Sequence, residues 1–260
     1  MNFLIIISNQ DIASLTFKQV IFSKYMLEEI KNNLFLMKND AKNKIYIKII
    51  DCLHITCKEE EILNDSLIID QIIFLTRHST LSEIKPKSMT VHACGNFGKA
   101  ELGGLDHTLT KTDPILIRSL LLKLKKNKPL LIKPYEVKQE ATHHGPSLSI
   151  STIFYEIGSS QEDWKNVDVA EYMLEILFNI INNYDKEEIK KERKWIEAVG
   201  IGGSHYCTKF NKKTFDEKEL NCFGHVVASY ALFEIKERPE LLEEAKEKSN
   251  SKLIIKEEEL

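Results

Sequence analysis

Short, continuous apolar runs alternate along this chain with amphipathic stretches, and this alternation limits the possible folds more than any other feature of the sequence. Alternating strands and helices predict an α/β fold with a mixed, mostly parallel sheet flanked by helices. Strands are predicted at 1–8, 45–50, 71–75, 89–93 and 148–157, and a last one at 195–201. Helices are predicted from Asp11 to about Met37, at 115–125 after Thr112-Asp113-Pro114, at 167–181, 184–194 and 218–235, and from Pro239 onward.

Length and composition fit a globular chain that buries its own core. The sequence has 260 residues, of which 43% are hydrophobic and 29% charged. No apolar run approaches the ~18–20 residues needed to cross a bilayer, and the five cysteines show no paired spacing. We therefore expect a cytoplasmic monomer without membrane contact. We expect a single α/β catalytic domain at 1–235, or two subdomains within it, followed by a frayed, charged C-terminal appendage at 236–260.

The histidines are the most informative candidates for chemistry. His78, His92 and His205 follow predicted strands, and the pair His143-His144 precedes one, each beside glycines or small polar residues. Ligands of α/β sheets bind at the carboxyl ends of strands, and imidazole supplies a base, an acid or a metal ligand near neutral pH. The sequence lacks the glycine-rich motifs for dinucleotides and for nucleoside triphosphates, and also the G-x-S-x-G elbow. The pattern favours hydrolysis or group transfer at a polar centre.

Spacing alone leaves a zinc site open, because neither H-E-x-x-H nor C-x-x-C is present. His92 lies two residues before Cys94 in extended sequence, as His205 does before Cys207, so each pair would share one side of the chain. Glu156 stands among apolar residues. It either orients a histidine by accepting a hydrogen bond or is a strand-edge acid that faces water.

Positive charge is concentrated between Lys111 and Lys138, where eight bases accompany two acids and give a net charge of +6. The whole chain has a net charge of −3. A patch of this kind is typical of phosphate contacts, although a solvated, lysine-rich helix end has the same composition.

Five loop segments, taken in order, resemble those of the archaeal/plant-type D-aminoacyl-tRNA deacylase family. The resemblance spans about residues 1–235, and the tail after Lys236 has no counterpart. It implies an α/β fold with a phosphorylase/peptidyl-tRNA hydrolase-like core, zinc dependence, and hydrolysis of the ester between a D-amino acid and tRNA, which is a chirality-proofreading reaction. Cys94 stands where many members have threonine, which argues against a cysteine nucleophile. The segments are HACGNFG at 92–98, ATHHGP at 141–146, FYEIGS at 154–159, GIGGSHY at 200–206 and GH at 224–225.

The residues and the resemblance together give each candidate a role. We expect His92, His143 and His205 to activate water, either directly or as ligands of Zn²⁺, and His78 and His144 to donate protons or to support the others. Glu156 and His225 are expected to support the catalytic histidines. Backbone amides near Gly145 and Gly202-Gly203 are expected to face the ester carbonyl, and a wall beside the α-carbon to exclude L-amino acids. Substrate contacts are expected from Asn96, Thr142, Gly145, Gly202, Gly203 and Tyr206, and tRNA contacts from Lys123, Lys125, Lys126 and Lys128.

Two alternative functions stay open on the sequence. One is a peptidyl-tRNA hydrolase-like or nucleoside phosphorylase-like enzyme, and the other is a non-catalytic RNA-binding module that uses the basic segment. The module would leave the histidine loops dispensable. The deacylase hypothesis instead requires that the rings of His92, His143 and His205 meet at one place in the fold.

Overall fold

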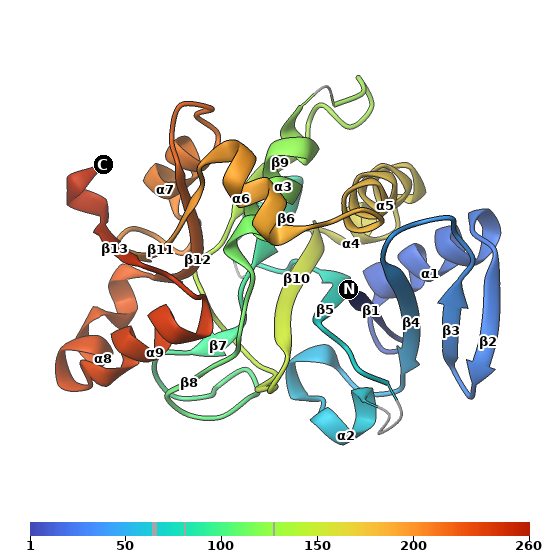
Figure 1. The fold of residues 1–260 in the computed structure, drawn as a ribbon, viewed down its shortest axis with the longest axis horizontal. Helices are drawn as coiled ribbons and strands as arrows, with labels where there is room; N and C mark the ends of the chain where they lie inside the picture. The colour runs from blue at the N-terminus through green and yellow to red at the C-terminus, as the bar shows by residue number, and fades with distance from the viewer. Residues whose placement is uncertain (64–66, 81, 127) are drawn as a thin grey trace.

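A mixed sheet of eight strands runs through the computed structural model, which describes residues 1–63, 67–80, 82–126 and 128–260 (Figure 1). The strand order is β2-β3-β4-β1-β5-β10-β6-β9. The neighbours from β4 to β10 are parallel, as are β6 and β9, so the predicted mixed, mostly parallel sheet is confirmed. The strands are β1 (Asn2–Ser8), β2 (Leu27–Lys31), β3 (Leu34–Met37), β4 (Lys44–Ile50), β5 (Gln71–Arg77), β6 (Ser88–His92), β9 (Glu136–Gln139) and β10 (Ser151–Gly158).

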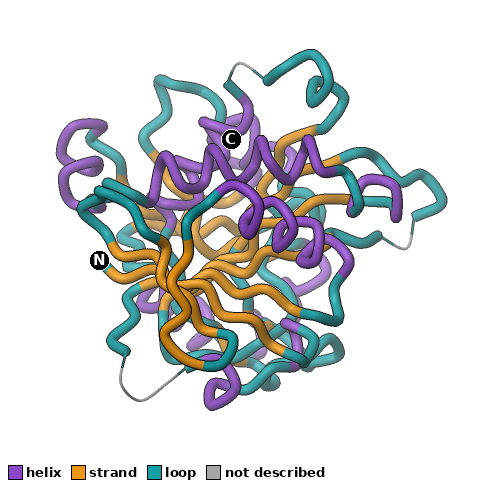
Figure 2. The backbone as a smooth tube through the Cα atoms, turned by 90° about the vertical axis from the view of Figure 1, so that its right-hand side faces the viewer, coloured by secondary structure: helices purple, strands orange, loops and turns teal. Residues whose placement is uncertain are grey.

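Helices cover the two faces of this sheet unequally (Figure 2). Because side chains alternate along a strand, Phe3 and Ile5 of β1 pack against α1, α3 and α5, whereas Leu4 and Ile6 face the smaller layer that includes α2. The helices are α1 (Ile12–Lys24), α2 (Glu59–Ile62), α3 (Pro114–Lys125), α4 (Gln161–Trp164), α5 (Val167–Ile181), α6 (Lys186–Arg193), α7 (Thr208–Thr214), α8 (Leu232–Glu237) and α9 (Glu240–Lys248), with 3-10 turns η1 (His54–Thr56), η2 (Ser229–Ala231) and η3 (Glu257–Glu259).

A second, parallel sheet consists of β12 (Asn221–Val227), β11 (Ile196–Ile201) and β13 (Leu253–Lys256). A two-stranded ribbon, β7 (Gly95–Asn96) and β8 (Thr108–Leu109), lies beside α8 and α9 (Figure 1). The segment after β9 joins the two sheets, because the amide of Ala141 donates to the carbonyl of His205 at 2.8 Å and that of Thr142 donates to Val226 at 2.9 Å. The junction between the sheets therefore holds two histidine-bearing loops side by side.

The predicted helix from Asp11 to Met37 is wrong beyond Lys24. Asp11 does cap α1, but β2 and β3 then form an antiparallel hairpin whose second strand pairs with β4. Asn33 adopts φ of 60° in the turn, a conformation that asparagine tolerates in tight hairpins. Pairing with a strand distant in sequence outweighed the weak helical spacing of the apolar residues.

The C-terminal third of the chain also differs from its prediction. The expected helix at 218–235 is instead the buried strand β12 followed by η2 and α8, and 196–201 is not the last strand. Residues 236–260 are not a frayed tail, since α9 buries Leu241 and Ala245 and β13 pairs with β11. A Cβ on Gly224 would lie 2.7 Å from Cβ of Ser249, so this segment packs tightly on β12.

The predicted start of α3 is confirmed and gives a test of stability. Asp113 accepts hydrogen bonds from the amides of Ile115 and Leu116 and, at 2.8 Å, from the buried hydroxyl of Tyr184. We expect Asp113→Ala to lower the free energy of unfolding by about 2–3 kcal/mol, because both a helix cap and a partner of a buried hydroxyl are lost. Urea denaturation measures this loss. Asp185→Ala removes the half-exposed cap of α6, which also pairs with Lys42 at the surface, and an equal loss in that control would contradict the expectation.

Candidate active site

Five histidines from four separate segments meet at the junction of the two sheets. His78 follows β5, His92 ends β6, the pair His143-His144 follows β9, and His205 follows β11. The ring centroid of His143 lies 4.4 Å from that of His92, 4.4 Å from that of His205 and 4.3 Å from that of His144. The structure thus brings together the rings of His92, His143 and His205, as the deacylase hypothesis required.

Strand register places Glu156 beneath this cluster. On β10, Phe154 pairs with His92, and two residues later Glu156 pairs with Thr90 on one side and Thr76 on the other. Both threonine hydroxyls donate to the carboxylate, at 2.9 Å and 3.0 Å. Glu156 is therefore a buried acceptor that faces histidines, and not a strand-edge acid in water.

Glu140 is the site residue that sequence reasoning missed. Its fully buried carboxylate lies 3.0 Å from Nδ1 of His78, 3.3 Å from Nε2 of His205 and 3.8 Å from Nε2 of His143. The strand that positions it, β9, was also not predicted. The available signal was a carboxylate three residues before His143, between a basic segment and two adjacent histidines.

Burial and charge divide the cluster into two kinds of group. Burial opposes charge on His78, but the two carboxylates beside it raise the pKa of His78 to about 10. Burial would raise the pKa of Glu140 and Glu156, yet their hydrogen bonds to histidines hold both values below the usual range. Burial, with neighbouring imidazoles, lowers the pKa of His143 and brings that of His144 to about 4. The neutral rings of His143 and His144 therefore lie beside the charged groups His78, Glu140 and Glu156.

Hydrogen bonds at Nδ1 fix the orientation of three rings. Nδ1 of His92 lies 3.0 Å from the carbonyl oxygen of Ala93, that of His143 lies 2.8 Å from Ala141, and that of His144 lies 2.6 Å from Gly145. A carbonyl oxygen only accepts, so each Nδ1 carries a proton. Burial opposes charge on His92, but the carboxylate of Glu156 raises the pKa of that ring. The lowered pKa values of His143 and His144 leave the lone pair of each of these neutral rings on Nε2. Metal-ligating histidines have this arrangement.

Overlapping sets of these side chains could hold metal ions. In each set the ligand atoms lie within 4.8 Å of one another. A histidine-rich set with carboxylates nearby suits Zn²⁺, and Nε2 of His92 has no hydrogen-bond partner among the described residues. The sets are His92, His143 and His144; Glu140, His143 and His205; and His78, Glu140 and Glu156.

Solvent reaches the cluster at one side. The side chains of His143 and His205 are 20% and 31% exposed, whereas those of His78 and His92 are almost fully buried. Tyr206, a predicted contact, lies at this opening with its ring centroid 5.3 Å from that of His205. A substrate would therefore meet His143 and His205 first.

Several predicted substrate contacts are instead used by the fold. The Asn96 amide donates to the carbonyls of Gly103 and Leu105, and Oγ1 of Thr142 accepts from the amide of Val226. The amides of Gly145 and Gly202 donate to Leu102 and Val227, so the expected role of these two amides at the ester carbonyl is wrong. A Cβ on Gly203 would meet the Glu257 carboxylate at 2.7 Å, so that glycine permits close packing.

His225 and Cys94 also have clear surroundings. Nδ1 of His225 lies 3.1 Å from Oγ1 of Thr142, so His225 contacts the segment that carries the histidine pair from outside the cluster. Burial lowers the pKa of His225 to about 3. Burial also raises the pKa of Cys94 to about 12, which agrees with the expectation that this thiol is no nucleophile.

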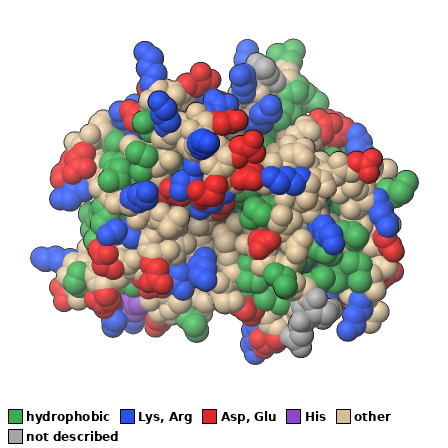
Figure 3. Space-filling model, viewed as in Figure 1, with side chains coloured by type: hydrophobic (Ala, Val, Ile, Leu, Met, Phe, Trp, Pro, Cys, Tyr) green, Lys and Arg blue, Asp and Glu red, His purple; other side chains and the backbone are tan. Residues whose placement is uncertain are grey.

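The basic segment is less of a surface patch than its sequence suggested. Arg118 is buried and donates to backbone carbonyls such as those of Asp216 and Glu219. Nζ of Lys128 donates to the carbonyls of Lys133 and Tyr135 and is therefore occupied by its own loop. The side chains of Lys123, Lys125 and Lys126 lie exposed at the end of α3. Figure 3 shows basic and acidic groups interspersed over the face that it presents.

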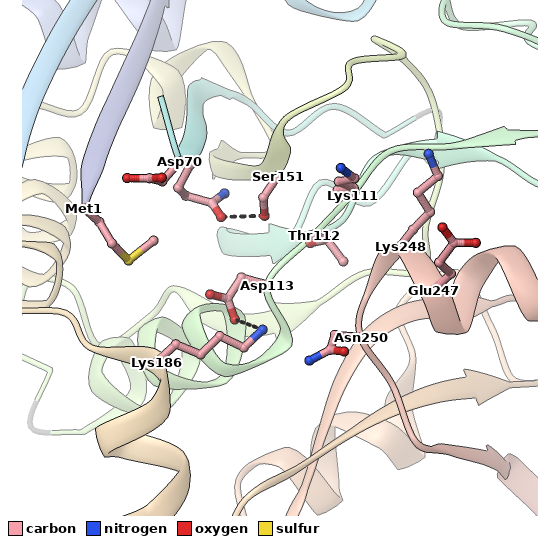
Figure 4. Close-up of a pocket in the computed structure, with 11 residues that line it drawn as sticks. Met1, Asp70, Lys111, Thr112, Asp113, Ser151, Lys186, Glu247, Lys248 and Asn250 are labelled. Carbon is pink, nitrogen blue, oxygen red and sulfur yellow. Dashed lines mark hydrogen bonds and ion pairs between the residues drawn. The ribbon is translucent and has the colours of Figure 1, made fainter. Parts of the chain in front are cut away.

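Two other features bear on binding. A hollow of about 240 Å³ lies at the opposite ends of β5 and β10 from the histidines, where Lys186 pairs with Asp113 (Figure 4). None of its described lining residues is a histidine, so it is separate from the cluster. Within the described part of the chain, no helix is both long and apolar enough to span a membrane.

Comparisons with known proteins agree on one family. A family model described as D-aminoacyl-tRNA deacylase matches residues 65–259, which includes most of the C-terminal segment. The chain is 32% identical over 254 residues to the D-aminoacyl-tRNA deacylase of Picrophilus torridus, covering 97% of this chain and 88% of that protein. Identity to the Thermococcus onnurineus deacylase is 32%, with coverage of 83% and 79%.

One solved structure resembles the whole chain. The crystal structure of the conserved protein of unknown function AF0625 matches with a TM-score of 0.75 at 26% identity. The match covers 99% of this chain and 95% of that protein. Both sheets and the histidine cluster therefore lie within the shared fold.

Proposed function

Since the chain belongs to the D-aminoacyl-tRNA deacylase family and so hydrolyses the ester between a D-amino acid and tRNA, we propose that the histidine cluster is its catalytic centre. This centre consists of five histidines and two carboxylates: His78, His92, His143, His144, His205, Glu140 and Glu156. This assignment depends on one observation: five imidazoles from four segments of the chain lie together beside two buried carboxylates. Groups with shifted pKa values that lie together at one solvent-accessible opening are typical of catalytic sites.

Ester hydrolysis requires that a water molecule lose a proton as it attacks the carbonyl carbon. Of the predicted bases, His143 and His205 are the two that solvent reaches. The neutral ring of His143 directs its Nε2 lone pair toward Glu140 and His205. We assign to these two histidines the positioning and deprotonation of water. His144 borders His143, but its pKa of about 4 and the lone pair on its Nε2 fit the supporting role expected from the sequence and not that of a proton donor.

The buried groups hold this pair in place. Glu140 contacts both His143 and His205, and His78 bridges Glu140 to Glu156 at 3.0 Å and 3.6 Å. The positive charge on His78 keeps both carboxylates ionised within the protein. Glu140 and Glu156 therefore act as positioning residues, as outer partners of catalytic histidines commonly do.

We propose that zinc binds this cluster. The fixed Nδ1 protons of His92, His143 and His144 leave three Nε2 atoms on which a metal ion could bind. When bound, Zn²⁺ would supply Lewis acidity that lowers the pKa of water to about 7. His205 on the solvent side and the buried Glu140 could complete the ligand set.

Removal of metal tests this proposal. We expect the purified protein to contain zinc, and a strong chelator to lower kcat about 10–100-fold, with zinc restoring the rate. Elemental analysis measures the metal independently of activity. A preparation that is free of metal and retains its full rate would rule out the zinc mechanism while leaving the histidine assignment intact.

The tRNA contacts form a separate part of the proposal. Lys123, Lys125 and Lys126 are exposed at the end of α3. Lys138 lies nearer the cluster, with its Nζ 4.5 Å from the ring centre of Tyr206 and 3.0 Å from the exposed carboxylate of Glu136, which a phosphate would have to displace. Cations in such positions could bind phosphates of the acceptor arm, and binding should then weaken as salt concentration rises. Lys128 is left out because its ammonium group is bound to its own loop.

The reaction itself is tested by comparing one tRNA charged with D-tyrosine or with L-tyrosine. We expect rapid release of the D-amino acid and slow release of the L-amino acid. The two differ only in configuration at the α-carbon, where the expected wall excludes the L-amino acid. The same assay with N-acetylaminoacyl-tRNA, and with a nucleoside and phosphate, examines the peptidyl-tRNA hydrolase and phosphorylase alternatives. Equal rates for D- and L-tyrosine would contradict selective deacylation.

A further inference from the structure

We propose that Tyr230 and Phe233 form a stacking platform for the unpaired terminal base of the tRNA substrate, next to the catalytic histidines. This inference rests on the proposed function, because it places the base relative to the ester at His143 and His205. The aminoacyl group is carried on the ribose of the last nucleotide. The base of that nucleotide therefore lies within one nucleoside of the reacting ester.

Both rings are exposed although large aromatic side chains are usually buried. Tyr230 is 65% and Phe233 is 67% exposed. Their spacing of three residues across the continuous helical turn of η2 and α8 places them on neighbouring positions of one side. Ala231 and Ile235 occupy the other side and pack into the core beside β11. The buried side of the turn thus anchors it to the core, and its two aromatic rings face solvent.

Tyr230 connects this surface directly to the catalytic cluster. Its hydroxyl lies 3.3 Å from Nδ1 of His205, and the two rings are inclined by only 26° with centroids 6.4 Å apart. His205 is the most exposed of the five clustered histidines. A base stacked on Tyr230 would thus place its own ribose beside His205.

A neighbouring loop also carries exposed apolar side chains. Leu102 and Leu105 are 57% and 61% exposed, and the carbonyl of Leu102 accepts from the amide of Gly145, next to His144. A hydrogen bond of 3.0 Å between Nε2 of His107 and the carboxylate of Glu234 joins this loop to α8. The loop is therefore held against the helix that carries Phe233.

The chemistry of the substrate suits this surface. An unpaired base has two open π-faces, and aromatic side chains bind such bases by stacking with little dependence on sequence. Enzymes that act on many tRNAs need contacts to the end that the tRNAs share. Stacking on Tyr230 and Phe233 would bind the shared terminal nucleotide and leave the amino acid to the histidine side.

Kinetics of Phe233→Ala test the platform. We expect KM for D-tyrosyl-tRNA to rise about tenfold with kcat nearly unchanged, because loss of one stacking contact weakens binding without touching the reacting atoms. Phe233→Trp should restore KM. Phe22→Ala, which removes a half-exposed aromatic side chain of α1, is the matched control and should leave both constants unchanged. An unchanged melting temperature excludes a merely structural effect.

Direct binding separates this inference from the proposed function. Calorimetry should show that adenosine monophosphate binds the wild-type protein and binds Phe233→Ala at least about tenfold more weakly, while ribose 5-phosphate, which lacks the base, binds neither. Tyr230→Phe, which keeps the ring and loses the hydroxyl, should bind adenosine monophosphate as the wild type does. Equal binding by wild type and Phe233→Ala, or an unchanged KM, would overturn the platform, whereas failure of the deacylation assay would overturn only the assigned function.

Discussion

His143→Ala is expected to lower kcat for D-aminoacyl-tRNA hydrolysis by about 10³-fold or more. His143 occupies the centre of the cluster, with the ring centroids of His92, His144 and His205 all within 4.4 Å of its own. In the proposed mechanism the Nε2 lone pair of His143 acts as a base or binds the metal ion, so the substitution removes the step that activates water. Single-turnover hydrolysis of D-tyrosyl-tRNA measures the effect.

Two controls give this result its meaning. The side chain of His143 is partly exposed, so the melting temperature should change by only a few degrees and the variant should still bind D-tyrosyl-tRNA. A second variant, His143→Gln, keeps polarity but not the imidazole and should be as inactive. Activity of either variant within about tenfold of the wild type would remove His143 from the catalytic centre.

Glu140→Gln is expected to lower kcat by about 10²–10³-fold and also to destabilise the protein. The carboxylate of Glu140 holds His78, His143 and His205 together at 3.0, 3.8 and 3.3 Å. The amide that replaces it has a similar shape but no charge, so His78 would keep Glu156 as its remaining carboxylate partner. Removal of one partner from a buried ion pair costs about 3–5 kcal/mol, which urea denaturation would detect.

Glu197 offers a matched control for loss of a buried charge. Its carboxylate is equally buried and lies 2.8 Å from Nζ of Lys190, but it belongs to β11 outside the histidine cluster. Glu197→Gln should therefore destabilise the protein while kcat stays near that of the wild type. If the two variants lose activity in proportion to their loss of stability, the specific positioning role of Glu140 is wrong.

The hydrophobic pattern predicted elements correctly where they carry a strong local signal. The helix at 167–181 and the start of α3 at Asp113-Pro114 are confirmed, as are the buried strands β1, β4 and β5. Prediction failed where pairing between distant segments decided the structure. The hairpin β2–β3 requires β4, and β12 requires β11 and the C-terminal segment. Local spacing contains no information on those partners.

Candidate catalytic histidines could be identified from the sequence because imidazoles beside glycines near strand ends are a local pattern. Glu140 could not be singled out among 39 acidic residues, since its importance arises from three histidines that reach it from other elements. The glycine amides show the reverse case. Gly145 and Gly202 looked free in the sequence, but backbone carbonyls of Leu102 and Val227 accept their protons in the fold.

The sequence by itself therefore determined the α/β class, the caps of α1 and α3 and the set of imidazoles available for chemistry. The tertiary structure decided which of these groups meet, which carboxylates hold them and which face solvent reaches. The physical reason is that hydrophobic periodicity and capping act over a few neighbouring residues. A buried ion-pair cluster, in contrast, depends on distances between side chains that only the packing of two sheets brings within 4 Å.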